Sequence, residues 1–205
     1  VQDPGPGTCP PTPSDPGDIG CVMPGGEIFA GDGNMYVTDA DQGTAQWSSE
    51  YVNTGADSNS DGASNQQWIV SNETLSEYPA FDICANLNRH GHADWYLPAL
   101  DELGIIISNR GAIAGFEGNN DYWSSTEGVP EDEQANLYQD FFGSYNQDDD
   151  RKDHVGNHVR CVRRPDTTDP VWSTAAGTVA TINTGDALST TVTATDDSGS
   201  VSYSK

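Results

Sequence analysis

The chain has 205 residues, and acidic residues outnumber basic ones by 32 to 8, which gives a formal net charge of −24 at pH 7. Such a charge repels phosphate backbones and anionic lipid, so nucleic acid and membrane surfaces are poor partners. Hydrophobic residues make up 34% of the chain, with 22 glycines and 12 prolines. We therefore expect a small core with long loops, and not a helical bundle.

The first third of the chain combines turn-rich segments with one hairpin pattern. Residues 1–25 form a Pro/Gly tract without a strict third-residue glycine, which predicts a linker or wrapped arm rather than a collagen helix. Residues 27–30 and 35–38 flank a Gly-Asp-Gly-Asn turn, which predicts a β-hairpin. Residues 53–66 are almost all Asn, Asp, Ser, Gly and Ala, so we expect a long surface loop there.

Two helices are predicted next. In the first, 76–89, Phe81, Cys84 and Leu87 recur every third position, which is typical of a buried stripe. The second, 97–111, begins with Leu-Pro and ends at a glycine, because proline suits the first helical turn and glycine the C-terminal position.

Strand patterns follow the helices. The segments 122–125, 135–142 and 158–163 are predicted to be strands, and the polar stretch 143–157 separates the last two. The fold class is therefore α+β, with two helices followed by a small antiparallel sheet.

A proline-bounded segment at 165–170 predicts a domain boundary. The residues after it are rich in Val, Thr and Ser and alternate, which predicts a partial all-β, immunoglobulin-like module over 165–205. Because the sequence stops within a strand-like pattern, we expect it to be a piece of a longer protein. The predicted organisation is an arm at 1–25, a main domain at 26–164 and this partial module.

The four cysteines, Cys9, Cys21, Cys84 and Cys161, are widely spread and show neither C-x-x-C nor zinc-ligand spacing. This pattern predicts two disulfides and an oxidising compartment. Three connectivities are open, and we favour Cys9–Cys21 with Cys84–Cys161. The longer bridge would stabilise the fold by roughly 4 kcal/mol in the chain-entropy model. No apolar run approaches the roughly 20 residues of a membrane span. The predicted disulfides lead us to expect an extracellular protein.

Three motifs lie in order along the middle of the chain: Asp-Trp-Tyr-Leu-Pro at 94–98, Tyr-Trp-Ser-Ser-Thr-Glu at 122–127, and Val-Arg-Cys-Val-Arg at 159–163. Together they resemble the bacterial family of collagen-like-protein C-terminal domains over roughly residues 70–164. The resemblance implies a C-type-lectin-like fold for the main domain. Some members of that family are variable proteins of diversity-generating retroelements, displayed on cells or virions.

The same motifs can be interpreted from their residues alone. Trp95 and Trp123 are predicted to be core aromatics rather than exposed stacking platforms. Arg160 and Arg163 alternate with apolar residues, so we expect them to point outward and to pair with neighbouring carboxylates. Their predicted role is structural rather than anion binding.

The resemblance places the ligand face on the last strands and their loops. In the segment 138–158, 14 of the 21 residues are Tyr, Asp, Gly, Ser, Asn or His. These residue types are reached from an asparagine codon by changing its adenines, which is what retroelement diversification leaves behind. A plain polar loop has a similar composition and would explain the segment without diversification.

Within this segment, aromatic side chains would supply rigid contact area and polar ones adaptable contacts. Gln139, Gln147 and Lys152 would be fixed positions. The predicted ligand-binding residues are Tyr138, Asp140, Phe142, Ser144, Tyr145, Asp148, Asp149, Asp150, His154, Asn157 and His158.

A calcium-loop pattern begins at residue 57. Asp57, Asn59 and Asp61 fit D-x-N-x-D-G, but the twelfth position is Trp68 rather than Glu. We therefore expect a solvated loop and no cofactor, although Ca²⁺ held by these three residues stays possible.

Three functions other than diversified binding fit parts of the sequence. Formylglycine-generating enzymes share the broad fold but need reactive cysteines, and the cysteines here are predicted to be paired. A fixed-specificity carbohydrate-binding adhesin, Ca²⁺-dependent or not, is the second of these functions, and a stalk spacer is the third. We predict a non-enzymatic receptor or adhesin on a cell or virion surface. Its partner would be a protein or glycan on another cell or particle surface, with no nucleic-acid binding and no membrane insertion.

Overall fold

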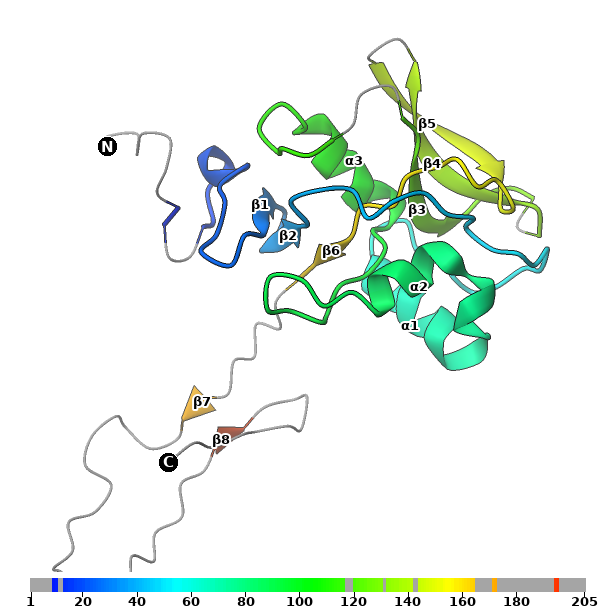
Figure 1. Ribbon diagram of the computed structural model, residues 1–205, viewed down its shortest axis with the longest axis horizontal. Helices are drawn as coiled ribbons and strands as arrows, with labels where there is room; N and C mark the ends of the chain where they lie inside the picture. Colours follow the sequence, from blue (N-terminus) through cyan, green and yellow to red (C-terminus); the bar gives the residue numbers. More distant parts are fainter. Residues whose placement is uncertain are drawn as a thin grey trace, which may run out of the picture. The chain divides into compact units, whose positions relative to one another are not determined.

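The computed structural model describes residues 9–10, 13–116, 120–130, 132–141 and 144–164, together with short strands at 171–172 and 194–195. The chain divides into two compact units, Val1–Pro165 and Asp166–Lys205. The first unit is mixed α+β (Figure 1), as predicted. Its elements are η1 (Pro16–Asp18), β1 (Ile28–Gly31), β2 (Met35–Val37), α1 (Gly62–Asn72), η2 (Leu75–Glu77), α2 (Pro79–Ala85), α3 (Leu100–Ser108), β3 (Tyr122–Glu127), β4 (Gln134–Phe141), β5 (Ser144–Arg151) and β6 (Val162–Arg163).

In the second unit, the structure describes only β7 (Val171–Trp172) and β8 (Ala194–Thr195), which pair antiparallel. The predicted immunoglobulin-like module otherwise lies outside the described residues. The predicted boundaries of arm, main domain and module stay predictions.

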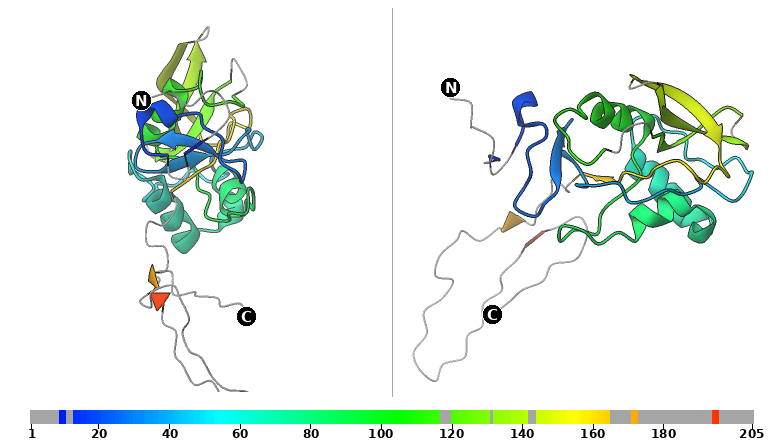
Figure 2. Two further views of the ribbon diagram at one scale, coloured as in Figure 1. Left: turned by 90° about the vertical axis from the view of Figure 1, so that its left-hand side faces the viewer. Right: turned by 45° about the horizontal axis from the view of Figure 1, so that its top comes forward.

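Two antiparallel three-stranded sheets form the first unit, in the orders β1-β2-β6 and β3-β4-β5. β6 comes from far along the chain and pairs with β2 through Val37 and Val162. Helix α3 contacts strands of both sheets, whereas α1 and α2 lie together on another side of the unit (Figures 1 and 2). The single small sheet that the sequence predicted is thus two sheets.

The predicted hairpin at the start of the domain is confirmed as β1 and β2. Its turn runs through four consecutive residues with positive φ: Gly31 (86°), Asp32 (42°), Gly33 (65°) and Asn34 (68°). Glycine adopts this left-handed backbone without a steric penalty, and Asn and Asp tolerate it better than other residues. The turn composition therefore specifies the hairpin.

The polar loop predicted at 53–66 is wrong in its second half, because α1 begins at Gly62. Asp61 caps this helix by accepting a hydrogen bond from the Ser64 N–H at 2.9 Å. The buried face of α1 includes polar side chains. Gln66 donates to the Trp95 carbonyl oxygen and accepts from the Leu97 N–H, so its burial is compensated. The described part of the unit therefore has three α-helices rather than two.

The helix predicted at 76–89 is shorter and broken. Residues Leu75–Glu77 form the 3-10 turn η2, and α2 spans only Pro79–Ala85. The cause is Pro79, which disfavours helical geometry in the residue before it. Tyr78 accordingly has φ −122° and ψ 68°. The second predicted helix is confirmed as α3, which occupies the middle of its predicted range.

The sequence predicts only a polar stretch between two strands at 143–157, but the first half of this stretch is strand β5. This strand pairs residue by residue with β4 from Gln134↔Arg151 to Phe141↔Ser144. A strand at the edge of a sheet needs no apolar residues on its exposed side, so hydrophobic alternation does not reveal it. In contrast, only Val162–Arg163 of the strand predicted at 158–163 is regular, as β6.

The core consists of two clusters that share the middle of the chain. One gathers Trp47, Trp95 and Trp123, and the other packs α3 against the first sheet. Trp95 and Trp123 are 1% and 0% exposed, which confirms them as core aromatics.

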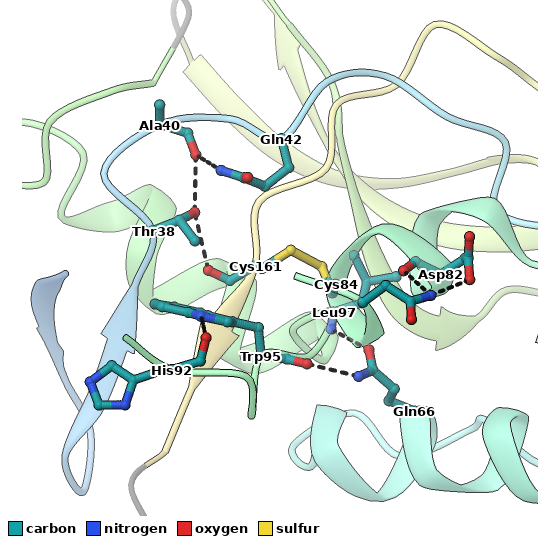
Figure 3. Close-up of a disulfide and its surroundings, with 11 residues drawn as sticks. Thr38, Ala40, Gln42, Gln66, Asp82, Cys84, His92, Trp95, Leu97 and Cys161 are labelled. Atoms are coloured by element: carbon teal, nitrogen blue, oxygen red, sulfur yellow. Dashed lines mark hydrogen bonds between the residues drawn. A yellow bond between two sulfur atoms is a disulfide. The ribbon is translucent and has the colours of Figure 1, made fainter. Parts of the chain in front are cut away.

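Both predicted disulfides are present. Cys9 and Cys21 join within the arm, and Cys84 in α2 joins Cys161, with 5.6 Å between the Cα atoms of the longer bridge. Figure 3 shows that bridge beside Trp95 and Leu97, inside the first core cluster. It ties the helical half of the domain to the segment that leads into β6.

Candidate ligand-binding face

The hairpin of β4 and β5 presents a polar surface on an apolar base. In β4, Ala135 and Leu137 are buried in the first core cluster, whereas Asn136 between them and Tyr138 after them are half-exposed. Successive side chains of a strand point to opposite faces, so one face of β4 anchors the hairpin in the core and the other is only partly covered.

Strand β5 is the most polar element of the domain. Its residues from 146 to 149, Asn-Gln-Asp-Asp, are all exposed. Asp150, which follows them, is half-buried. These side chains therefore contribute little to the core and are available to solvent.

A buried ion pair fixes the end of this hairpin. Lys152 is 0% exposed, and its Nζ atom lies 2.5 Å from Oε1 of Glu127 at the end of β3. It also donates to the Val52 carbonyl oxygen at 2.7 Å and lies 4.8 Å from the centre of the Trp47 ring. Both carboxylate oxygens of Glu127 accept the Thr54 N–H at 3.0 Å. The end of β5 is thus held to two distant segments.

The chain after β5 is held by the carboxylate of Asp150. Its Oδ2 atom accepts a hydrogen bond from Nδ2 of Asn157 at 3.1 Å and lies 2.5 Å from Nδ1 of His154. Asn157 is 1% exposed, whereas the side chain of His154 is 49% exposed. The turn therefore has a rigid inner side and an accessible histidine.

His158 belongs to a different cluster. Its Nδ1 atom lies 3.2 Å from Oδ2 of Asp41, which also accepts a hydrogen bond from the Tyr122 hydroxyl at 2.7 Å. Arg160 is fully buried there and donates to Asp41 at 3.0 Å and to the carbonyl oxygens of Thr38, Ala114 and Gly115. Burial lowers the pKa of the Arg160 guanidinium, and the Asp41 carboxylate opposes that shift.

The arginines predicted to point outward are therefore buried, although they do pair with carboxylates. Arg163 is 7% exposed, and its Nε atom donates to Asp94 at 2.8 Å. The buried side chains of both arginines connect separate segments of the chain through these hydrogen bonds. Alternation with Val and Cys does not distinguish a solvent-facing arginine from one whose charge is compensated inside.

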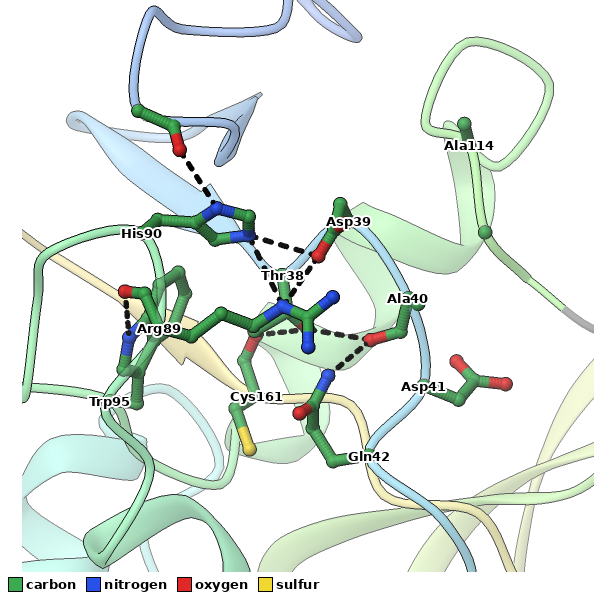
Figure 4. Close-up of polar contacts among 12 residues, drawn as sticks. Thr38, Asp39, Ala40, Asp41, Gln42, Arg89, His90, Trp95, Ala114 and Cys161 are labelled. Atoms are coloured by element: carbon green, nitrogen blue, oxygen red, sulfur yellow. Dashed lines mark hydrogen bonds and ion pairs between the residues drawn. The ribbon is translucent and has the colours of Figure 1, made fainter.

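A further ion-pair cluster joins the first sheet to the loop after α2 (Figure 4). Arg89 donates through Nε to Oδ1 of Asp39 at 2.6 Å, and Nε2 of His90 lies 2.9 Å from the same oxygen. The hydrogen bond from Arg89 is the main reason why the pKa of Asp39 falls to about 2. Nδ1 of His90 reaches the Gly25 carbonyl oxygen at 2.9 Å, so the cluster also fastens the end of the arm.

A family model for the Lcl C-terminal domain matches residues 35–163, which run from β2 to β6 and include the second sheet and two strands of the first, but not β1. The chain belongs to this family. The match confirms the resemblance carried by the three motifs and extends it toward the N-terminus as far as β2. Comparison with curated proteins and with solved structures gave no significant match.

The predicted ligand-binding residues differ in their exposure within this Lcl C-terminal domain. Asp148, Asp149 and His154 are exposed on or beside the hairpin, and Asp150 and Asn157 pair below them. The side chains of Asp140, Ser144 and Tyr145 and all of Phe142 lie outside the described residues.

Tyr138 belongs partly to the scaffold of the domain. Its ring packs beside the second core cluster, and its hydroxyl accepts a hydrogen bond from Nε2 of Gln147 at 3.1 Å. A Cβ atom at Gly104 in α3 would collide with this hydroxyl, so the glycine makes room for the tyrosine. Gln147, predicted only as a fixed position, is itself exposed on the face.

The calcium pattern has another structural use in this domain. Asp61 caps α1, and the carbonyl oxygen of Asn59 accepts the Asp101 N–H at 2.8 Å. Asp57 is exposed. Among the residues that the structure describes, no group of three or more His, Cys, Asp and Glu side chains is arranged to hold a metal. Calcium binding by Asp57, Asn59 and Asp61 stays a prediction.

The residues that sequence reasoning missed are the partners of the buried cations. Glu127 and Lys152 are 25 positions apart, and Asp41 and Arg160 are 119 apart. No local pattern signals such pairs. Arg160 lies between Val159 and Cys161, which is a hint of burial, whereas Lys152 lies in a polar and charged stretch that offers none.

Two disulfides indicate that the domain resides in an extracellular or otherwise oxidising location. Within the described part of the chain, no helix is long and apolar enough to cross a membrane.

Proposed function

We propose that this Lcl C-terminal domain is a non-catalytic ligand-binding module, displayed on a cell or virion surface. Its fold would be of the C-type-lectin type, and its ligand face would be the β4–β5 hairpin with the turn through His154. The observation that carries the proposal is the contrast between the rigid base of this hairpin and its exposed polar side chains.

The residues at the base of the hairpin are fixed in place by the folded core. Ala135 and Leu137 fill the core, and Lys152 is held by Glu127 at 2.5 Å. The exposed side chains above them are largely independent of the core. Such an arrangement supports binding, because side chains on a rigid element lose little entropy when a ligand docks.

Charge limits the class of ligand. The described basic residues in ion pairs with carboxylates are Arg89, Arg151, Lys152, Arg160, Arg163 and Arg164. With these charges compensated and a net charge of −24, the remaining surface is anionic. This supports a neutral or cationic protein or glycan on another cell or particle, and it disfavours nucleic acid.

The proposal includes diversification of the ligand face by a retroelement. The exposed residues Asn146, Asp148 and Asp149 are of the types that adenine changes in asparagine codons produce. The test is to sequence the surrounding DNA for a near-copy of codons 120–160 that differs almost only at adenines, beside a reverse-transcriptase gene. Without such a copy, a fixed-specificity adhesin becomes the better account of the same face.

The ligand face itself is tested by substitution. A face variant carries Gln147→Ala, Asp149→Ala and His154→Ala. Wild type and variant are applied to a printed array of glycans and extracellular proteins. For each glycan or protein that wild type binds, we expect the face variant to bind at least about tenfold more weakly, which is a loss of about 1.4 kcal/mol.

The matched control replaces Glu50, Gln67 and Asn88 with alanine. All three are exposed residues outside the hairpin. The control should bind the array as wild type does. A face variant that binds as wild type does, or a control that loses binding, places the ligand elsewhere.

A further inference from the structure

Strand β5 lies at the edge of its sheet, and the backbone N–H groups that point away from β4 can be identified. In its sheet of order β3-β4-β5, it pairs with β4 alone among the described strands. The Lys152 N–H that follows the strand donates to the Glu133 carbonyl oxygen, on the β4 side, at 3.0 Å. Because N–H groups alternate along a strand, those of Arg151 and Asp149 point away from β4.

These two outward N–H groups, at the C-terminal half of β5, have acceptors within their own strand. The Asp149 N–H donates to Oδ1 of Asp148 at 2.9 Å, and the Arg151 N–H donates to Oδ1 of Asp150 at 2.7 Å. Unpaired N–H groups on a sheet edge are a template for a further strand. Here two of the donors that such a strand would need, the N–H groups of Asp149 and Arg151, are already bonded to carboxylates.

The same carboxylates add charge to the edge. If two copies of the chain paired antiparallel through β5 about a two-fold axis at Asp149, Asp148 of one copy would face Asp150 of the other. Like charges directly opposite one another destabilise a strand pair. A second copy could not pair through residues 148–151 in this way without breaking the two hydrogen bonds and bringing these carboxylates together.

We propose that Asp148 and Asp150 are edge guards, which close β5 to strand addition by a second copy of this chain. These two carboxylates keep strand β5 from pairing with another copy, while the side chains of β5 stay available to solvent. This inference stands on the strand geometry and is independent of the ligand. It also means that a ligand contacts the side chains of β5 rather than its backbone.

Adjacent residues of β5 provide a matched test in the full chain. Asp148→Thr removes one cap and one charge. Asp149→Thr removes the same charge from the same strand, but its carboxylate caps no N–H among the described contacts. Asp150 is left in place because it also holds Asn157. The association of wild type and both variants is measured by sedimentation equilibrium at low and at high salt, which screens the charge repulsion.

We expect Asp148→Thr to associate with a constant about tenfold or more above that of Asp149→Thr, and wild type to remain a single copy. In the associated variant, amide exchange at residue 149 should slow as protein concentration rises. Near-UV circular dichroism checks that both variants keep the native core.

Equal association of the two variants would show that only net charge matters, and would overturn the role of the caps. Wild type that associates with a protected Asp149 amide would overturn the guard altogether. If Asp148→Thr unfolds, Asp148→Ala serves in its place with the same expectation, and Asp148→Asn is its control. Its side-chain oxygen still accepts the N–H without the charge, so it should behave as Asp149→Thr does.

Discussion

Nζ of Lys152 lies 2.5 Å from Oε1 of Glu127, and both side chains are within about 1% of full burial. The pair joins the end of β5 to the end of β3, and Glu127 extends the link to Thr54 through the backbone. The most exposed hairpin of the domain is therefore held at its base by one of its most buried ionic contacts. Removing either partner would leave a charge without compensation in the core.

The first prediction concerns this pair. Lys152→Met should lower the free energy of unfolding by about 3–5 kcal/mol, because Glu127 is left buried and unpaired. Urea denaturation measures the loss. Amide exchange of β5 should also become faster, since its C-terminal anchor is gone.

The double variant Lys152→Met with Glu127→Leu separates the lost charge pair from lost packing. It should recover most of the stability, since no uncompensated charge remains. A single variant that loses less than about 1 kcal/mol would mean that the pair is hydrated and contributes as a surface ion pair does.

The second prediction compares two arginines of different burial. Arg160 is 0% exposed and bonds Asp41 and three carbonyl oxygens, whereas the side chain of Arg151 is 64% exposed and pairs with Asp153. Arg160→Met should cost about 3–5 kcal/mol, whereas Arg151→Met should change the stability little, because solvent screens its ion pair. Thermal unfolding of both variants gives the difference, and equal losses would contradict the assigned roles.

The third prediction concerns the two disulfides. The bridge Cys84–Cys161 spans 77 positions and Cys9–Cys21 spans 12. The chain-entropy model makes the longer one more stabilising by about 1.5 kcal/mol. Replacing each pair with alanine and measuring denaturation should reproduce that order. The opposite order would indicate that the arm contributes more to folding than its position at the edge of the domain suggests.

The fourth prediction is a pH dependence due to Asp39. Its pKa is lowered to about 2, chiefly by the hydrogen bond from Arg89, against about 3.9 in an unfolded chain. A depressed carboxyl pKa stabilises the fold above the unfolded value, and that contribution is lost as pH falls from about 4 to about 2. Since the side chain is 41% exposed, solvent screening keeps the contribution below about 1 kcal/mol.

The comparison of wild type with Asp39→Asn isolates this contribution. Wild type should be the more stable protein at pH 7, and the difference should close between pH 4 and pH 2. Asp57→Asn, at an exposed residue, controls for the removal of one charge from an acidic chain. A difference between wild type and Asp39→Asn that stays constant over this range would show that the Arg89 contact does not form in solution.

The fifth prediction concerns calcium. Asp61 is engaged as the cap of α1 through both carboxylate oxygens, which bond Ser64 at 2.9 and 2.6 Å. We therefore expect the Tm to be the same in EDTA and in excess Ca²⁺. A higher Tm with Ca²⁺, abolished by Asp57→Asn, would establish a calcium site in this loop instead.

Much of the fold followed from local chemistry. The glycine-rich turn predicted the first hairpin, the Leu-Pro start predicted α3, and the spread of cysteines predicted the disulfides. The three motifs predicted the family. These features depend on short-range backbone preferences and on residue types with a single dominant use, so the order of residues alone determines them.

The rest depended on contacts between distant segments. Helix α1 is polar in sequence, and its place is set by hydrogen bonds from Gln66 to Trp95 and Leu97, 29 and 31 positions away. Strand β5 has no apolar pattern, and β4 supplies its pairing. Whether a polar residue such as Asn157 faces solvent or Asp150 cannot be known until the chain has turned back on itself. Composition therefore indicated where the candidate face lies, but burial and pairing decided which of its residues are exposed.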